Sequence, residues 1–219
     1  MAYVAPTVRS VGDAVTAADY NIMANDVIDH ETRIGDSGLV LVTPTSVSGT
    51  GMSVSGGQIY LSAVTTGTIN GVFTSTYQTY DVVVSVSGTN NNQFCYLQLS
   101  TGGTASSTDY KSGVRAFDYL ASNSTFDYTD GNVETRIIIG NPESSSVMQM
   151  FAKMTINNPA VATGSSFFGQ SVGTASAVQN RAFIFAGQHR NVTSYDGLVI
   201  TQSVGSVTGT IRVYGHTKS

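Results

Sequence analysis

The side chains best suited to chemistry gather between residues 118 and 134. This stretch holds four acids, with aromatic residues among them. Paired carboxylates can supply the acid and the base of glycoside hydrolysis, and aromatic rings can stack on the apolar faces of sugars. A long surface hairpin with solvated acids would carry the same residues. We predict a candidate glycan-contact loop here, made of Asp118, Tyr119, Phe126, Asp127, Tyr128 and Asp130.

The other reactive residue types give no catalytic or metal-binding pattern. Nucleophile–base catalysis needs a histidine beside a serine or cysteine, but the three histidines are scattered and none is near Cys95 in sequence. Zinc needs closely spaced Cys and His ligands, and these are missing. We therefore predict no catalytic residue, no metal, no cofactor and no enzyme. Glycan cleavage by the acids near 118–134 is kept as a remote alternative.

Charge is concentrated at the N-terminus. The chain has 14 acids and 10 bases, and residues 1–36 hold six of the acids and two of the bases, so residues 37–219 carry eight of each. Only 11% of all residues are charged, against a usual quarter. A weakly charged body favours a surface shared with neighbouring subunits or one that contacts neutral ligands. Nothing is basic enough to indicate nucleic-acid binding.

The same N-terminal segment carries the one strong helix signal. Thr16 is a suitable N-cap, with Asp19 as its capping partner, and the apolar positions after it alternate spacings of three and four, a heptad pattern. A single amphipathic helix lying on its own β domain would show this stripe, as would a short parallel bundle around a symmetry axis. We predict that residues 1–36 form an arm and a helix for anchoring and oligomerisation. The predicted oligomerisation stripe is Tyr20, Met23, Val27, His30 and Ile34.

Beyond this segment the hydrophobic period changes to two. Short runs rich in β-branched and aromatic residues recur about every ten residues and are separated by turn residues, which predicts roughly nine to eleven antiparallel strands. The clearest predicted hairpin joins 79–86 to 93–99 around an Asn-rich turn. We expect a mostly β chain, with a linker and first short strand at 37–57 and an antiparallel β-sandwich or jelly roll at 58–219.

Three methionines share one face of a predicted strand near residue 150. Met148, Met150 and Met154 are more typical of adaptable core filling than of a ligand site, although this face is also a candidate subunit seam if the body trimerises. The single cysteine cannot form an internal disulfide. No signal peptide and no run of eighteen apolar residues are visible. We therefore expect a protein made in a host cytoplasm, without membrane insertion.

Several phrases resemble virion proteins of tailed bacteriophages. Residues 11–21 resemble a Gly-Asp-x-x-Thr-Ala-x-x-Tyr/Trp-Asn phrase that opens a helix near the attachment end of small virion proteins. Phrases of the body are similar to β-sandwich domains that close many phage tail-fibre and virion-surface proteins. These phrases lie at 71–77, 80–84, 194–198 and 209–215.

The resemblance implies a virion structural protein and provides no catalytic residues. It implies a homotrimeric tail appendage, such as a short fibre or baseplate component, that presents the β-sandwich for host-surface attachment. A capsid decoration (cement) protein that stabilises the head is the alternative. The expected partners are other copies of the chain, further virion proteins bound through the N-terminal arm, and a host surface glycan.

Overall fold

The computed structural model describes residues 38–90, 93–118, 125–129, 135–142, 144, 149–176 and 179–217, and only the backbone of residues 118, 125–129, 174–176 and 179–180. These residues are mostly β. They form sixteen strands and no helix, and all strand pairs among them are antiparallel. The predicted oligomerisation stripe lies outside the described residues: Tyr20, Met23, Val27, His30 and Ile34.

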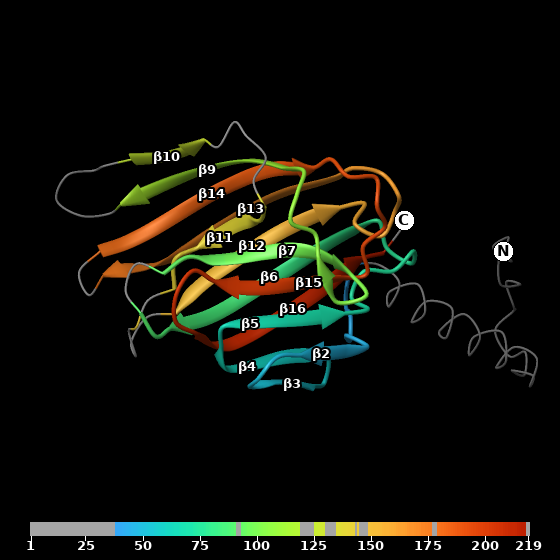
Figure 1. Cartoon of the computed structure of the whole chain (residues 1–219), viewed down its shortest axis with the longest axis horizontal. Coiled ribbons are helices and arrows are strands. Elements are labelled where there is room, and N and C mark those ends of the chain that lie inside the picture. The colour runs from blue at the N-terminus through green and yellow to red at the C-terminus, as the bar shows by residue number, and fades with distance from the viewer. Residues whose placement is uncertain are drawn as a thin grey trace, which may run out of the picture. The chain divides into compact units, whose positions relative to one another are not determined.

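A ten-stranded large sheet forms one layer of the body, in the order β10-β9-β14-β13-β12-β6-β16-β4-β3, with β1 paired to β16. Figure 1 shows this sheet behind the smaller one. Its strands are β1 (Leu39–Leu41), β3 (Met52–Ser55), β4 (Gln58–Val64), β6 (Thr79–Gly88), β9 (Tyr110–Asp118), β10 (Thr125–Thr129), β12 (Met150–Asn157), β13 (Ser165–Ser176), β14 (Gln179–His189) and β16 (Val207–His216).

A six-stranded small sheet forms the other layer, in the order β11-β7-β15-β5-β2, with β8 paired to β7. Its strands are β2 (Ser46–Ser48), β5 (Thr66–Asn70), β7 (Cys95–Thr101), β8 (Thr104–Ala105), β11 (Ile137–Gly140) and β15 (Gly197–Gln202). Eight strands form two sets of four, β4-β16-β6-β12 in the large sheet and β5-β15-β7-β11 in the small one. The remaining long strands, β9, β13 and β14, widen the large sheet beyond β12. We call these three strands together with β12 the extension.

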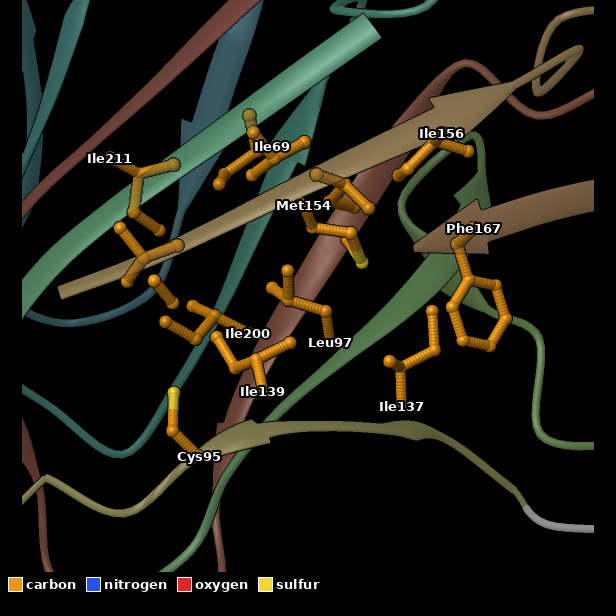
Figure 2. Packing of buried hydrophobic residues seen from close by; sticks show 14 of the residues in the cluster. Ile69, Cys95, Leu97, Ile137, Ile139, Met154, Ile156, Phe167, Ile200 and Ile211 are labelled. Atoms are coloured by element: carbon orange, nitrogen blue, oxygen red, sulfur yellow. The ribbon is translucent and has the colours of Figure 1, made fainter. Parts of the chain in front are cut away.

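The core lies between the two sheets. Figure 2 shows Leu97, Ile139 and Ile200 of the small sheet against Met154 and Ile211 of the large one. All five side chains are at most 1% exposed. Each fully buried aliphatic side chain of this size contributes about 1.5–3 kcal/mol, so this shared core holds the layers together.

Strict alternation along β12 explains how one strand serves two surfaces. Met150 and Met154 face the core and are each 1% exposed, whereas Phe151 between them points to the outer face and is 49% exposed. Successive side chains of a strand point to opposite faces of the sheet. The prediction that the methionines fill the core is confirmed for these two, so the described part of the methionine face is no subunit seam. Met148 lies outside the described residues.

The predicted hairpin of 79–86 with 93–99 is wrong. Strand β6 pairs with β12 and β16 in the large sheet, whereas β7 pairs with β11 and β15 in the small one. The chain between them therefore crosses from one layer to the other, a distance of about 10 Å between packed sheets. Alternation identifies the apolar side of each strand, but it does not identify the strand beside it.

Two segments rich in small and polar residues add strands to the sheets. Residues 165–176, rich in Ser and Gly, form β13, which pairs with β12 on one side and β14 on the other. Within 37–57, expected as a linker with one short strand, the structure places β1, β2 and β3, which pair with β16, β5 and β4. The compact body accordingly begins at Leu39. Backbone hydrogen bonds, on both sides of β13 and on one side of β1, β2 and β3, outweigh the weak strand propensity of such residues.

Candidate functional site

The outer face of the large sheet is divided into two chemically different ends along the extension. Paired residues of neighbouring strands form rows that cross the sheet, since opposite residues in antiparallel pairs point to the same face. One row runs from Phe151 through Val172 and Ala182 to Phe117. We call this row, together with Ile184, the apolar end.

The apolar end exposes large hydrophobic side chains to solvent. The exposed fractions are 49% for Phe151, 53% for Val172, 45% for Ile184 and 37% for Phe117. Ala182 leaves space between them, and a groove of about 300 Å³ lies there, with Gln170 at its side. Grouped exposed hydrophobic residues in a weakly charged protein mark an interaction surface more often than single ones do.

At the opposite end of the same strands, paired residues form a second row, and this row is polar. It runs from Thr79 of β6 through Asn157, Ser166 and Gln188 to Lys111 of β9. The Thr79 hydroxyl donates a hydrogen bond to Oδ1 of Asn157 at 3.1 Å. A pocket of about 330 Å³ opens at this row, and we call the row and pocket the polar end. Its lining includes Asn157, Asn158, Ser165, Ser166, Gln188 and Arg190.

Between the two ends, β13 carries Phe168, which is 57% exposed, and β6 carries a buried carboxylate. Asp81 of β6 is 2% exposed although it points to the outer face. Lys153 Nζ lies 2.8 Å from Oδ2, the Thr155 hydroxyl donates to Oδ1 at 2.6 Å, and His216 Nε2 is 3.4 Å from Oδ1. Burial would raise the pKa of Asp81, but the hydrogen bonds from Lys153 and Thr155 outweigh it and hold the pKa below its ordinary value. The carboxylate is therefore ionised and neutralised by Lys153.

Behind the polar end, a half-buried serine and a buried histidine lie together, although they are far apart in the sequence. The Ser106 hydroxyl lies 3.0 Å from His189 Nε2, and Tyr195 Oη is 3.3 Å from His189 Nδ1. The imidazole is fully buried and packs edge-on against Tyr110 and Tyr195, at centroid distances of 4.4 and 5.1 Å. Nothing in the sequence signals this pair, since 83 residues separate its members.

This cluster has the distance of a nucleophile–base pair, but its histidine is buried. His189 is 0% exposed although it is among the residues that line the polar pocket, and the half-buried Ser106 lines neither that pocket nor the apolar groove. Burial lowers the pKa of His189, against the opposing effects of a hydrogen bond to the Thr108 backbone and of the Asp109 charge. A neutral imidazole held by two tyrosines is typical of a framework that fixes the ends of β9 and β14. We interpret the cluster as support for the polar end.

The cysteine is also part of the interior. Cys95 is fully buried and accepts a hydrogen bond from Gln202 Nε2 at 3.2 Å. Burial raises its pKa to about 12, against the smaller lowering effect of the Gln202 hydrogen bond. The thiolate form of Cys95 is therefore rare at neutral pH, and a thiol that is seldom ionised is a poor nucleophile.

The predicted glycan-contact loop lies only partly within the described residues. Asp118 ends β9, and the residues 126–128 lie on β10, which pairs with β9 in antiparallel register. The side chains of Asp118, Phe126, Asp127 and Tyr128 are not described, and Tyr119, Asp130 and Glu134 lie outside the described residues. The loop thus stays a prediction, as does glycan cleavage by its acids.

Within the described part of the chain, no group of three or more His, Cys, Asp or Glu side chains is placed to hold a metal ion. No helix of that part has the length and apolar character needed to cross a membrane. Comparison of the chain with protein-family models, with curated proteins and with solved structures found no match. The two ends of the extension are therefore the features on which a functional argument rests.

Proposed function

We propose that this chain is a structural protein of a bacteriophage particle, a homotrimeric tail appendage that presents its β body for attachment to the host surface. We also propose that the body is a jelly-roll β-sandwich. The strand orders β4-β16-β6-β12 and β5-β15-β7-β11 support this, because eight strands in two facing sets of four with these orders are the jelly-roll arrangement found in viral capsid and lectin domains.

The observation that carries the proposal is the exposed apolar end. Phe117, Phe151 and Val172 stand in one row on the outer face of the large sheet. The inner face of the same sheet is already covered, because its side chains pack in the core. Nothing among the described residues of the body covers them. The occupant we propose is the same face of neighbouring copies, which meet around a symmetry axis.

Charge compatibility favours a second copy over a charged partner. A face that meets its own copy meets its own charges, so it must be close to neutral where the copies touch. Lys153, which adjoins the apolar end, is neutralised within its own subunit by Asp81 at 2.8 Å. The residues of the groove are apolar or uncharged. Arg115, opposite Ile184, is the charged residue that adjoins the apolar end on β9. The groove itself therefore brings no charge to the axis when copies meet there.

The size of the surface indicates that it does not act alone. Four strands about 4.8 Å apart, followed over about six residues, give a footprint of roughly 400 Å². A standard interface buries about 800 Å² of each partner. The apolar end thus supplies about half of a stable interface. The predicted stripe of residues 20–34 is the sequence feature available to supply the rest.

The proposal is tested by labelling intact phage particles with gold-tagged antibody against residues 39–217 and imaging them. Gold at the tail is expected. Gold over the head would replace the appendage with the decoration alternative, and the next measurement would be the heat tolerance of particles that lack the protein. Particles without gold, from lysates in which the protein is abundant, would overturn the virion assignment.

The oligomeric state gives a separate check on the apolar end. Sedimentation equilibrium of the full chain is expected to show trimers, and residues 39–217 alone are expected to associate more weakly. A full chain that stays monomeric at high concentration would contradict the homotrimer. A body that associates as strongly as the full chain would contradict the role of residues 1–36.

A further inference from the structure

We propose that the polar end of the extension is a binding site for a saccharide that bears an acidic group. The site is distinct from the predicted loop at residues 118–130 and from the apolar end. Its role in host-surface attachment rests on the proposed function. Sugar binding itself does not, because it is measured on the isolated chain.

The lining of this pocket has the chemistry that sugars require. Planar amides and hydroxyls offer paired donors and acceptors to neighbouring sugar hydroxyls. Asn157, Ser166 and Gln188 stand side by side on three adjacent strands, and the pocket continues to Asn158 and Arg190. The side chains of Ser166 and Gln188 are exposed and make no hydrogen bond to the described residues. Their polar groups are therefore available to a ligand.

The charge of the pocket selects an acidic ligand. No carboxylate is among the residues that line it. Arg190 is exposed at its edge and forms no ion pair with any described carboxylate. A guanidinium binds a carboxylate or phosphate oxygen pair through two parallel hydrogen bonds, which are stronger than its hydrogen bonds to uncharged sugar hydroxyls because both partners are ionised.

The pocket is also rigid, which lowers the entropic cost of binding. Asn158, with φ of 58°, starts the turn after β12, and its carbonyl accepts hydrogen bonds from Val161 N and the Ser165 hydroxyl. Tyr195 N donates to the Pro159 carbonyl at 2.8 Å, which fixes the turn to the chain before β15. Arg190 N donates to the Asp109 carbonyl at 2.9 Å, and this bond anchors the chain just after β14.

The test uses the full chain, with trigalacturonic acid as the acidic probe and its methyl ester as the neutral one. Nuclear magnetic resonance titration is expected to give a dissociation constant of about 0.1–1 mM for the acid, typical of a few hydrogen bonds. Shifts should concentrate at the amides of Ser166, Gln188 and Arg190. Arg190→Gln should weaken binding of the acid about tenfold.

The methyl ester distinguishes recognition of the probe's negative charge from nonspecific binding of the saccharide. The wild-type chain should bind the ester about tenfold more weakly than the acid, and Arg190→Gln should abolish that difference. Arg212→Gln removes the same charge from the same sheet face on β16, away from the pocket, and should leave binding unchanged. Equal weakening by both variants would overturn the site, as would the absence of shifts at tens of millimolar probe.

The outcomes also distinguish this inference from the proposed function. Gold-labelled tails together with a chain that binds neither probe would refute the saccharide site alone. Probe binding by a chain absent from particles would refute the virion assignment alone. Shifts confined to β9 and β10 would move the saccharide site to the predicted loop and overturn the polar end.

Discussion

The apolar end and the polar end lie on the same strands, a few residues apart, and differ only in what points outward. Inward, both ends bury apolar residues: Met150 and Ile156 of β12 are each 1% exposed. Outward, β12 carries Phe151 at one end and Asn157 at the other. The core constrains the inward positions everywhere, whereas solvent alone does not select a row of large hydrophobic side chains. The contrast therefore indicates that each end has a partner of its own.

The boundary between the ends is electrostatic on β6 and β12, whereas on β13 it is the exposed side chain of Phe168. Asp81, Lys153 and Thr155 form a compensated group in which a nearly buried carboxylate is held by a half-exposed lysine. Its charges cancel locally, so neither the apolar end nor the polar end is dominated by them. Each end can then bind according to its own side chains.

The largest expected effect comes from placing a charge in the apolar end. Phe151→Asp should weaken self-association of the full chain about 100-fold or more, because several carboxylates would meet around the symmetry axis. Sedimentation velocity over a range of concentrations measures it. The matched change Ser166→Asp in the polar end should leave self-association unchanged. If both variants dissociate equally, the two ends do not differ as proposed.

Removing the cation between the ends should reduce stability. Lys153→Met leaves the Asp81 carboxylate buried without its ion pair, at a cost of about 1–2 kcal/mol once the exposure of Lys153 is taken into account. Urea unfolding followed by fluorescence measures the loss. The double variant Lys153→Met/Asp81→Asn should recover most of it. If the double variant is as unstable as Lys153→Met alone, Lys153 stabilises the protein through packing and not through its charge.

Acid should act on the polar end more than on the apolar end. Because the pKa of His189 is lower in the folded protein, the unfolded chain binds a proton first, and stability falls as pH drops below about 6.5 towards the folded pKa. Hydrogen exchange, corrected for the intrinsic effect of pH, should rise at two amides near His189. These are Arg190 N, which donates to the Asp109 carbonyl, and Leu99 N, which donates to the Tyr110 hydroxyl. A rise confined to Val172 would contradict it.

The smallest expected effect is on Cys95, which reports whether surface variants disturb the interior. Its pKa of about 12 and its full burial predict slow labelling by a maleimide at pH 8 until the body unfolds. Labelling rates of Phe151→Asp and Arg190→Gln should match the wild type. Faster labelling in either variant would mean that its effect on binding comes from the core.

Much of the fold class followed from the sequence. Alternation of apolar and polar residues predicted an antiparallel, mostly β body, and it assigned Met150 and Met154 to the core correctly. The same reasoning failed where the fold depends on long-range pairing. The Asn-rich connection after β6 predicts a hairpin, yet it joins two layers. The segment 37–57, expected as a linker with one short strand, contributes β1, β2 and β3.

Sequence alone therefore determined the local properties of this protein: the period-two pattern, the weak charge of the body and the acidic N-terminal segment. Only the tertiary structure decided which residues become neighbours. It set Phe117 in one row with Phe151, and Gln188 in one row with Asn157, across three and two strand pairings respectively. The reason is physical: side-chain direction is fixed by the residue's own backbone, whereas register is fixed by hydrogen bonds to strands far away in the chain.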